Sequence, residues 1–362
     1  MSDNRSRKKR KSNASYVLEI LLCLIALTAI IFAMLFLVRS HNLEDRVNEL
    51  QDRIDIYEDP ADPYIPTSRA EAMILDQKDE NYAVAYNEGR YKLLNDMKQT
   101  LLDSDSVLKT FQKFYPDDLI IYYEGDYLFY PISQQLRHHT YDNSLFNSLD
   151  NGRIAYVSSD VSTETWIDVS KFQGKVKWSE VAKDGIDGTM IRIGYRGYSK
   201  GDIMMDDTFE DNIEGALKND LQAGVYFLSQ AISEEEAVEE AEYVIEILQD
   251  YEITGPVALD IELVGGDDGR GNALSMEERT RYSIAFLERI KKADYDPLIY
   301  GNLKSFLIML DLEKLEDYPK WFASYDDEPY WPYEMDYWQY TEKGRVDGID
   351  GDVDLNIKFI KE

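Results

Sequence analysis

The chain of 362 residues has only one cysteine, Cys23, and three histidines. A single cysteine excludes an intrachain disulfide framework and a zinc site of the Cys/His type. The histidines are His41, His138 and His139, which leaves little scope for a Ser-His-Asp triad. Basic residues are also scarce, since 39 Lys and Arg stand against 70 Asp and Glu and give a net charge of −31. Such a charge repels a phosphate backbone, so we expect no nucleic-acid partner.

The basic residues that are present gather at the amino terminus. Residues 1–15 hold six of them against one aspartate, which predicts a short cytoplasmic tail. Residues 16–38 follow as the most apolar run, with Glu19 its only charge. The uncharged part, residues 20–38, would be about 29 Å long as a helix, close to the thickness of the hydrocarbon core. Because no small-residue cleavage site ends the run, we expect an uncleaved transmembrane helix with the rest of the chain outside the cell.

Residues 39–67 are predicted to form a stalk and a linker. Apolar residues spaced four and three apart are typical of a short coiled coil or of a lone juxtamembrane helix. They are Leu43, Val47, Leu50, Ile54 and Tyr57. Three prolines in residues 58–67 then break the helix. The coiled coil would make the protein a homodimer through the stalk and the lone helix would not, and the sequence is compatible with both.

Residues 68–164 are predicted to form a small α+β domain without an assigned role. The expected elements are a helix and three strands, at residues 68–102, 119–124, 127–132 and 153–157. Gly125-Asp126 is a suitable two-residue hairpin turn between two of these strands. The tyrosines of this region predict either an exposed surface for a ligand or a membrane-protein partner, or the packed core of a spacer domain. The spacer interpretation is favoured.

Strand and helix patterns alternate through residues 165–362. Eight strands are predicted, at residues 166–170, 189–194, 224–229, 256–263, 297–301, 320–324, 336–340 and 353–357. Five helices are predicted between the first six strands, at residues 178–183, 209–219, 234–250, 276–293 and 303–315. Ser233 with Glu236, and Ser275 with Glu278, predict capping boxes at two helix starts. The alternation predicts an α/β fold, and eight strands favour a TIM-like barrel over an open sheet.

Carboxylates stand at three of the predicted strands. Asp260 and Glu262 end the fourth strand two positions apart, so both side chains point to one face, roughly 6–7 Å apart. Asp168 on the first strand and Asp354 on the eighth should approach this pair, because these strands are neighbours in a closed barrel. Repulsion and partial burial raise the pKa of at least one such carboxyl, as general-acid cleavage of a glycosidic bond requires. Solvated acids or a metal site are the alternative.

Aspartates also alternate with glycines before the last strand. They are Asp347, Asp350, Asp352 and Asp354. This pattern is open to two interpretations, a Ca²⁺ loop or a hairpin between the last two strands, and the hairpin is favoured. We therefore expect neither a metal ion nor a cofactor.

The segment 165–362 resembles the glycoside hydrolase family 25 lysozymes, N-acetylmuramidases that cut peptidoglycan. Seven motifs carry the resemblance in the family's order: Ile-Asp168-Val-Ser-Lys-Phe-Gln-Gly, Met-Ile-Arg192-Ile-Gly-Tyr195-Arg-Gly, Ala-Gly-Val-Tyr226-Phe, Ala-Leu-Asp260-Ile-Glu262, Trp321-Phe-Ala-Ser-Tyr325, Trp338-Gln339-Tyr and Val-Asp354-Leu-Asn356. The resemblance implies a modified TIM-like barrel of eight strands and five helices. It does not extend to residues 1–164.

The resemblance also implies roles for the carboxylates. Glu262 matches the general acid of the family. Asp260 matches its partner, which stabilises a cationic intermediate or helps the substrate's own N-acetyl group to attack. Asp168 and Asp354 match acids that orient the site.

Further matched positions imply contacts with the sugar. Tyr226, Trp321 and Trp338 match aromatic residues near the sugar groove, and aromatic rings offer apolar faces to the apolar faces of sugars. Arg192 and Tyr195 are the other candidates for substrate binding. The chain has Phe227 where family members often have histidine.

Together these features predict a single-pass protein of a bacterial cell membrane, of the Gram-positive type, with an external muramidase domain that remodels the wall locally. The predicted partners are peptidoglycan glycan strands and, through the N-terminal helix, membrane lipid. The alternative is a catalytically silent protein that binds wall glycan or serves as a scaffold for a membrane complex.

Overall fold

The computed structural model describes residues 80–360 except positions 105, 150, 265, 267 and 268. The chain divides into two units after Asp103. The predicted tail, transmembrane helix, stalk and linker, residues 1–67, lie outside the described part. No helix in that part is both long and apolar enough to cross a membrane.

Helix α3, Glu80–Ser104, is what the structure describes of the first unit, and its last residue already belongs to the second. It agrees with the later part of the helix predicted over residues 68–102. The helix carries local polar contacts typical of a solvent-facing surface, such as the bond of 2.7 Å from Gln99 Nε2 to Asp103 Oδ1 one turn later.

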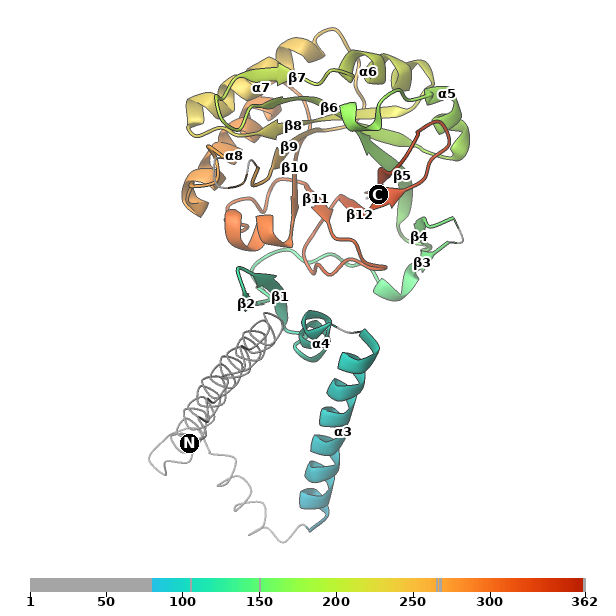
Figure 1. Cartoon of the computed structure of the whole chain (residues 1–362), viewed down its shortest axis with the longest axis vertical. Helices are drawn as coiled ribbons and strands as arrows, with labels where there is room; N and C mark the ends of the chain where they lie inside the picture. The colour runs from blue at the N-terminus through green and yellow to red at the C-terminus, as the bar shows by residue number, and fades with distance from the viewer. Residues whose placement is uncertain (1–79, 105, 150, 265, 267–268, 361–362) are drawn as a thin grey trace, which may run out of the picture. The chain divides into compact units, whose positions relative to one another are not determined.

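Eight strands close a barrel in the second unit (Figure 1). They are β5 (Ser162–Val169), β6 (Gly188–Arg196), β8 (Gln222–Ser229), β9 (Val257–Ile261), β10 (Pro297–Asn302), β11 (Lys320–Ala323), β12 (Tyr337–Gly344) and β13 (Val353–Ile360). Strand β5 pairs with both β6 and β13, which closes the ring. This confirms the eight predicted strands and their order. Neighbours are parallel except at β13, which runs antiparallel to both β12 and β5, and the short strand β7 (Ile203–Met205) pairs with β6 outside the ring.

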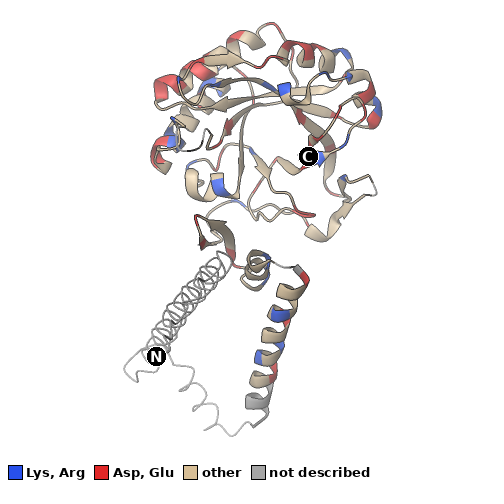
Figure 2. Cartoon of the chain, in the orientation of Figure 1, with Lys and Arg blue, Asp and Glu red and all other residues tan. Residues whose placement is uncertain are grey.

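Four α-helices and one short π-helix accompany the strands: α5 (Trp178–Val181), α6 (Phe209–Lys218), α7 (Glu234–Leu248), α8 (Met276–Lys291) and the π-helix Ser305–Met309. The last is shorter than the helix predicted over residues 303–315. The helix does not continue to residue 315, because the backbone N–H of Asp311 donates to Thr280 Oγ1 of α8 at 2.8 Å instead of to a helix carbonyl. Acidic residues gather on the helices, and α7 has seven glutamates and no basic residue (Figure 2).

One of the two predicted capping boxes is complete. At α8 the Ser275 hydroxyl and the Glu278 carboxylate each accept a backbone N–H from the other residue. At α7 the Ser233 hydroxyl accepts the N–H of Glu236, but the Glu236 carboxylate accepts from Ile232 instead. Both hydroxyls still cap their helices.

Residues 104–161 belong to the same unit as the barrel, so the predicted boundary at 164/165 falls inside that unit. Their elements are α4 (Val107–Phe114), the hairpin β1 (Asp118–Tyr123) and β2 (Asp126–Pro131), and the pair β3 (Phe146–Ser148) and β4 (Ile154–Tyr156). The Tyr141 ring stacks on Phe359 of β13 with centres 4.0 Å apart. The Tyr330 hydroxyl donates to the carbonyl of Asp118 at 2.9 Å. Tyr141 belongs to this region and Tyr330 follows β11, so the two contacts pack the region against the barrel.

The hairpin turn lies one residue earlier than predicted. Tyr123 pairs with Asp126, so the two turn residues are Glu124 and Gly125, with φ of 51° and 96°. A two-residue hairpin loop of this kind requires a positive φ at both of its residues, and glycine adopts a positive φ without strain. Asp126 pairs with Tyr123 and is the first residue of the second strand.

The barrel interior is filled by alternate residues of the strands. The buried cluster there consists of Trp166, Met190, Ala258, Leu298, Trp321 and Tyr337. The intervening residues, such as Ile167 and Ile191, join the larger core outside the barrel. Polar residues at the ends of the inward-facing rows therefore meet at the rim of the barrel.

We expect Gly188→Ala to lower the free energy of unfolding by about 1–3 kcal/mol, because the new Cβ would overlap the Trp166 ring inside the barrel. Urea unfolding of the purified chain measures the change. Gly197→Ala is the matched control, since a Cβ there meets only ordinary contacts, the nearest at 3.5 Å. Equal destabilisation by the two substitutions would contradict this account of the barrel interior.

Candidate active site

A pocket of about 270 Å³ opens at the rim where the parallel strands end. All four predicted carboxylates contribute to it, from β5, from the end of β9 and from the start of β13. Seven of the nine predicted site residues line it: Asp168, Asp260, Glu262, Asp354, Tyr226, Trp321 and Arg192.

Asp168 and Asp354 lie directly opposite each other on the neighbouring strands β5 and β13. Asp168 is near the end of its strand and Asp354 near the start of its own. Only the antiparallel direction of β13 brings both to the same rim. Burial, and then the nearby charge of Asp168, raise the pKa of Asp354 to about 8.

Asp168 is buried and held by two amide groups. Its Oδ2 accepts hydrogen bonds from Gln339 Nε2 and Asn356 Nδ2, each at 2.9 Å. Burial raises the pKa of Asp168 to about 6, and the two bonds oppose that rise because they favour the ionised form. Among the carboxyls of the pocket, Asp168 has the surroundings best suited to a negative charge.

The orientation of both amides is fixed by other donors. Trp321 Nε1 donates to Asn356 Oδ1 at 2.7 Å. The hydroxyls of Tyr300 and Tyr325 donate to Gln339 Oε1 at 2.9 and 3.0 Å. Because each amide oxygen already accepts, each amide N–H must turn toward the carboxylate.

Asp260 and Glu262 differ in exposure. Asp260 is buried, and its Oδ1 accepts no hydrogen bond from the described residues. Glu262 is an exposed residue at the mouth of the pocket, and its carboxyl is partly shielded from water there. Burial raises the pKa of both carboxyls, and the charges of Glu262 and Asp168 raise that of Asp260 further. Since the pKa of Asp354 is about 8, the pocket retains at least one proton near neutral pH.

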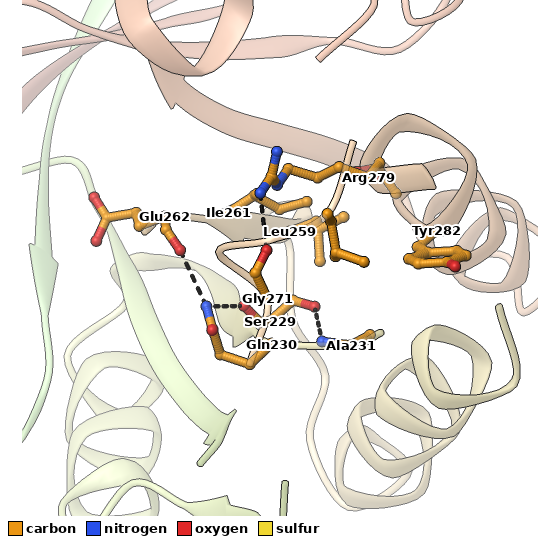
Figure 3. A pocket seen from close by; sticks show the side chains of 11 residues that line it. Ser229, Gln230, Ala231, Leu259, Ile261, Glu262, Gly271, Arg279 and Tyr282 are labelled. Atoms are coloured by element: carbon orange, nitrogen blue, oxygen red, sulfur yellow. Dashed lines mark hydrogen bonds between the residues drawn. The ribbon is translucent and has the colours of Figure 1, made fainter. Parts of the chain in front are cut away.

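The chain that carries Glu262 is anchored by Gln230 (Figure 3). The buried Gln230 amide donates to the backbone carbonyl of Glu262 at 3.0 Å and to that of Ser229 at 2.8 Å. Nearby, Arg279 of α8 donates to the carbonyl of Gly271 at 2.8 Å. The bond from Gln230 to Glu262 holds the end of β9 against the end of β8, which limits the positions open to the Glu262 carboxyl.

Arg192 is neutralised by Asp206, a residue to which sequence analysis assigned no role. Asp206 Oδ2 lies 2.7 Å from Arg192 Nε and 2.5 Å from Nη2, and both side chains are buried. The guanidinium lies 5.1 Å from the centre of the Phe172 ring. Arg192 thus supports the pocket wall more than it supplies free charge.

Two predicted substrate-binding residues lie outside this pocket. Trp338 is fully buried on the outer face of β12, where its ring packs edge-on against Phe146 and its Nε1 donates to the carbonyl of Ser324 at 3.0 Å. The prediction for Trp338 is corrected because strand alternation turns its neighbour Gln339 inward. Tyr195 lines a second pocket that adjoins the first.

Several residues without a predicted role complete the pocket. They include Phe172, Tyr300, Tyr325 and Gln339, with Asn356 behind them. The alternation of inward and outward side chains along a strand could have identified Gln339 and Asn356 as pocket residues, since each follows an apolar residue of a buried strand. A polar side chain at an inward position needs a buried partner, and Asp168 is that partner.

No group of three or more His, Cys, Asp or Glu is placed to hold a metal ion in the described part of the chain. In the aspartate-rich connection of β12 and β13, Asp352 pairs with Arg345 at 2.5 Å. The two strands are antiparallel neighbours, as a hairpin requires.

We expect Asp354→Asn to stabilise the fold at pH 8 and to change it little at pH 4. An aspartate in the unfolded chain titrates near pH 4, whereas the folded Asp354 has a pKa of about 8. The wild type therefore loses stability as the pH rises between these values, and asparagine does not. Urea unfolding should show a gain that grows as the pH rises from 4 to 8 and reaches at most about 5 kcal/mol. The exposed Asp350→Asn is the control, and a gain independent of pH would contradict the assignment.

Comparison with known proteins agrees with this geometry. Residues 167–349 match the model of the glycosyl hydrolases family 25. The chain is 27% identical over 198 residues to the uncharacterized protein YegX of Escherichia coli strain K12, covering 53% of this chain and 68% of YegX. It is 24% identical over 191 residues to the autolytic lysozyme of Clostridium acetobutylicum, covering 52% of this chain and 54% of that enzyme.

The fold is also similar to a solved structure, the modular autolysin LytC of Streptococcus pneumoniae. The TM-score is 0.51 at 20% identity, over 67% of this chain and 52% of LytC. The chain thus spans about half the length of that autolysin. Since the family model covers half of the sequence and the barrel carries the carboxylates of its motifs, the chain belongs to the glycosyl hydrolases family 25.

Proposed function

We propose that the chain is a muramidase that hydrolyses the β-1,4 bond from N-acetylmuramic acid to N-acetylglucosamine in peptidoglycan. The observation that carries the proposal is the pair of carboxyls at the end of β9, one exposed at the pocket mouth and one buried beside it. A relative described as an autolytic lysozyme supports the same substrate class.

Glu262 is the proposed general acid. Burial raises the pKa of its carboxyl, so it keeps a proton at a pH where an ordinary glutamate has lost it. Its position at the mouth allows it to reach the bridging oxygen of a bound glycan. Transfer of the proton to that oxygen neutralises the leaving group as the glycosidic bond breaks.

Asp260 is the proposed partner of the acetamido group of the substrate. Its buried Oδ1 has no hydrogen-bond donor among the described residues and is free to accept the acetamido N–H. Holding that N–H directs the acetamido carbonyl oxygen toward the anomeric carbon, where it displaces the leaving group before water completes hydrolysis. The new hydrogen bond also favours the ionised form of Asp260.

Asp168 and Asp354 complete the proposed charge arrangement. Asp168, supported by Gln339 and Asn356, provides a negative charge near the cationic transition state. Asp354 keeps a proton beside it, which avoids a second charge on the neighbouring strand. Trp321 and Tyr226, in edge-to-face contact at 5.9 Å, give the pocket an aromatic wall for the sugar ring.

We expect Glu262→Gln to lower kcat by about 100-fold or more, because glutamine cannot donate the proton. The full-length chain in detergent is incubated with purified peptidoglycan, and the soluble products are reduced and identified by mass spectrometry. Reducing-end muramic acid from the wild type identifies the cleaved bond.

Glu277→Gln, at an exposed glutamate of α8, is the matched control and should retain wild-type activity. Reducing-end N-acetylglucosamine would assign cleavage to the other glycosidic bond. No products at all, with the protein still pelleting with the wall, would favour the alternative of a glycan-binding or scaffold protein.

We propose further that residues 16–38 anchor the protein in the cell membrane with the barrel outside. The basic cluster before this apolar run and the acidic sequence after it support this orientation. An anchored hydrolase acts only within reach of its stalk, which suits local remodelling of the wall.

Protease added to intact cells stripped of their wall should release a fragment that contains the barrel, with cleavage in the proline-containing linker at residues 58–67. An antibody against the barrel detects the fragment in the supernatant, and lysed cells provide the control for full cleavage. A barrel that stays protected until the cells are lysed would show that the orientation is wrong.

A further inference from the structure

A second pocket, of about 630 Å³, adjoins the catalytic pocket. The two pockets share Phe172, Arg192 and Leu228 in their walls. The far side of the second pocket comes from residues 197–202, which connect β6 to β7. The volume is within the range of sites that bind small organic ligands.

Phe172 stands between the two pockets and is 78% exposed. The backbone N–H of Lys171 donates to Asp206 Oδ2 at 3.2 Å, and the same carboxylate holds Arg192. The Arg192 guanidinium in turn lies 5.1 Å from the centre of the Phe172 ring. The exposed ring is therefore supported from below, as a ligand-binding surface requires.

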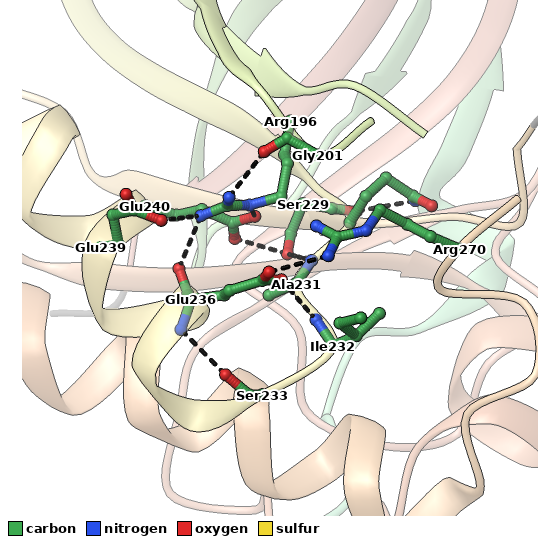
Figure 4. A network of polar contacts seen from close by, with 11 residues as sticks. Arg196, Gly201, Ser229, Ala231, Ile232, Ser233, Glu236, Glu239, Glu240 and Arg270 are labelled. Atoms are coloured by element: carbon green, nitrogen blue, oxygen red, sulfur yellow. Dashed lines mark hydrogen bonds and ion pairs between the residues drawn. The ribbon is translucent and has the colours of Figure 1, made fainter. Parts of the chain in front are cut away.

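A buried network of ion pairs holds the connection at residues 197–202 (Figure 4). Arg196 Nη1 donates to the carbonyl of Gly201 at 2.7 Å, and Arg196 Nε pairs with Glu240 at 2.7 Å. The backbone N–H of Arg270 donates to the carbonyl of Tyr198 at 2.9 Å. Because this connection is tied to the barrel at two points, the residues it presents to the pocket keep a defined position.

The basic residues around this pocket differ in how they are paired. Arg192 and Arg196 are neutralised by buried carboxylates. Lys171 Nζ lies 3.6 Å from Asp207 and 5.4 Å from the centre of the Tyr195 ring. Lys200 is exposed and forms no ion pair within the described part of the chain. Asp202, also exposed, lines the same pocket and likewise forms no ion pair with a described residue. Charges of both signs at this wall suit a ligand that carries charged groups of its own, and Lys200 is the group that can pair with a carboxylate.

We propose that the second pocket binds the peptide that muramic acid carries on its lactyl group. This inference rests on the proposed muramidase activity. Such a peptide combines small apolar side chains with free carboxylates. Phe172, Tyr198 and Met204 present exposed apolar surface to it, and Lys200 provides the matching charge. The shared wall places the pocket next to the sugar in the catalytic pocket, where the peptide begins.

The test compares two soluble glycans of equal length, one with its peptides and one stripped of them by an amidase. The full-length wild type in detergent should cleave the peptide-bearing glycan with a kcat/KM about tenfold higher. Lys200→Gln should reduce this ratio to about one or two, and Lys200→Arg should keep most of it. Lys218→Gln, an exposed lysine at the end of α6, is the matched control and should leave the ratio unchanged.

Calorimetry on Glu262→Gln gives the same comparison without turnover. The peptide-bearing glycan should bind about tenfold more tightly than the stripped one, and Glu262→Gln combined with Lys200→Gln should abolish the difference. The inference would be overturned if the wild type had the same kcat/KM and affinity for both glycans, or if Lys200→Gln left the ratio between the two glycans unchanged. A wild type that cleaves neither glycan but prefers the peptide-bearing one in binding would overturn the muramidase proposal alone.

Discussion

Asp168 is a carboxylate buried at the point where β13 closes the barrel, and a buried charge is tolerated only when its hydrogen bonds are made. The amides of Gln339 and Asn356 make them, and the amide oxygens are occupied by donors from β10 and β11 and the residues that follow. Four strands thus support a carboxylate that a fifth strand, β5, carries. A shift of any of them would leave a buried polar group without its partner, so closure of the barrel and construction of the site are the same event.

The other acids near the rim fall into two kinds. Asp206 and Glu240 are buried against Arg192 and Arg196, and these pairs support the walls of the two pockets. Asp260, Glu262 and Asp354 line the catalytic pocket and form no ion pair with any residue that the structure describes. Burial raises pKa values in both kinds, since the pKa of the paired Glu240 also rises to about 7. Pairing therefore separates the carboxylates that hold the structure from those available for proton transfer. At the second pocket, Lys200 forms no ion pair with any residue that the structure describes, and it is the group that we propose for contact with the ligand.

Local sequence predicted the strands well because each buried strand is a short apolar run, and it predicted the carboxylates because they end such runs. It failed where distant segments decide the outcome. Trp338 appeared to belong to the sugar groove, but the outer face of β12 is covered by Phe146 from a distant part of the chain. The helix predicted over residues 303–315 ends early because Thr280 of α8 takes the N–H of Asp311. Aromatic contacts such as Tyr141 on Phe359 likewise join residues on the two sides of position 164, and they depend on segments far apart in the sequence.

The sequence by itself determined the succession of eight strands, the family of the domain and the four carboxylates, because these depend on residue type and on spacing along the chain. Only the tertiary structure decided the antiparallel direction of β13, through which the predicted meeting of Asp354 and Asp168 takes place at one rim. It also decided which basic residues are neutralised, since Arg192 and Arg196 find their partners on other elements while Lys200 finds none among the described residues. Pairing across strands depends on which segments lie side by side in space, and spacing along the chain does not contain that information.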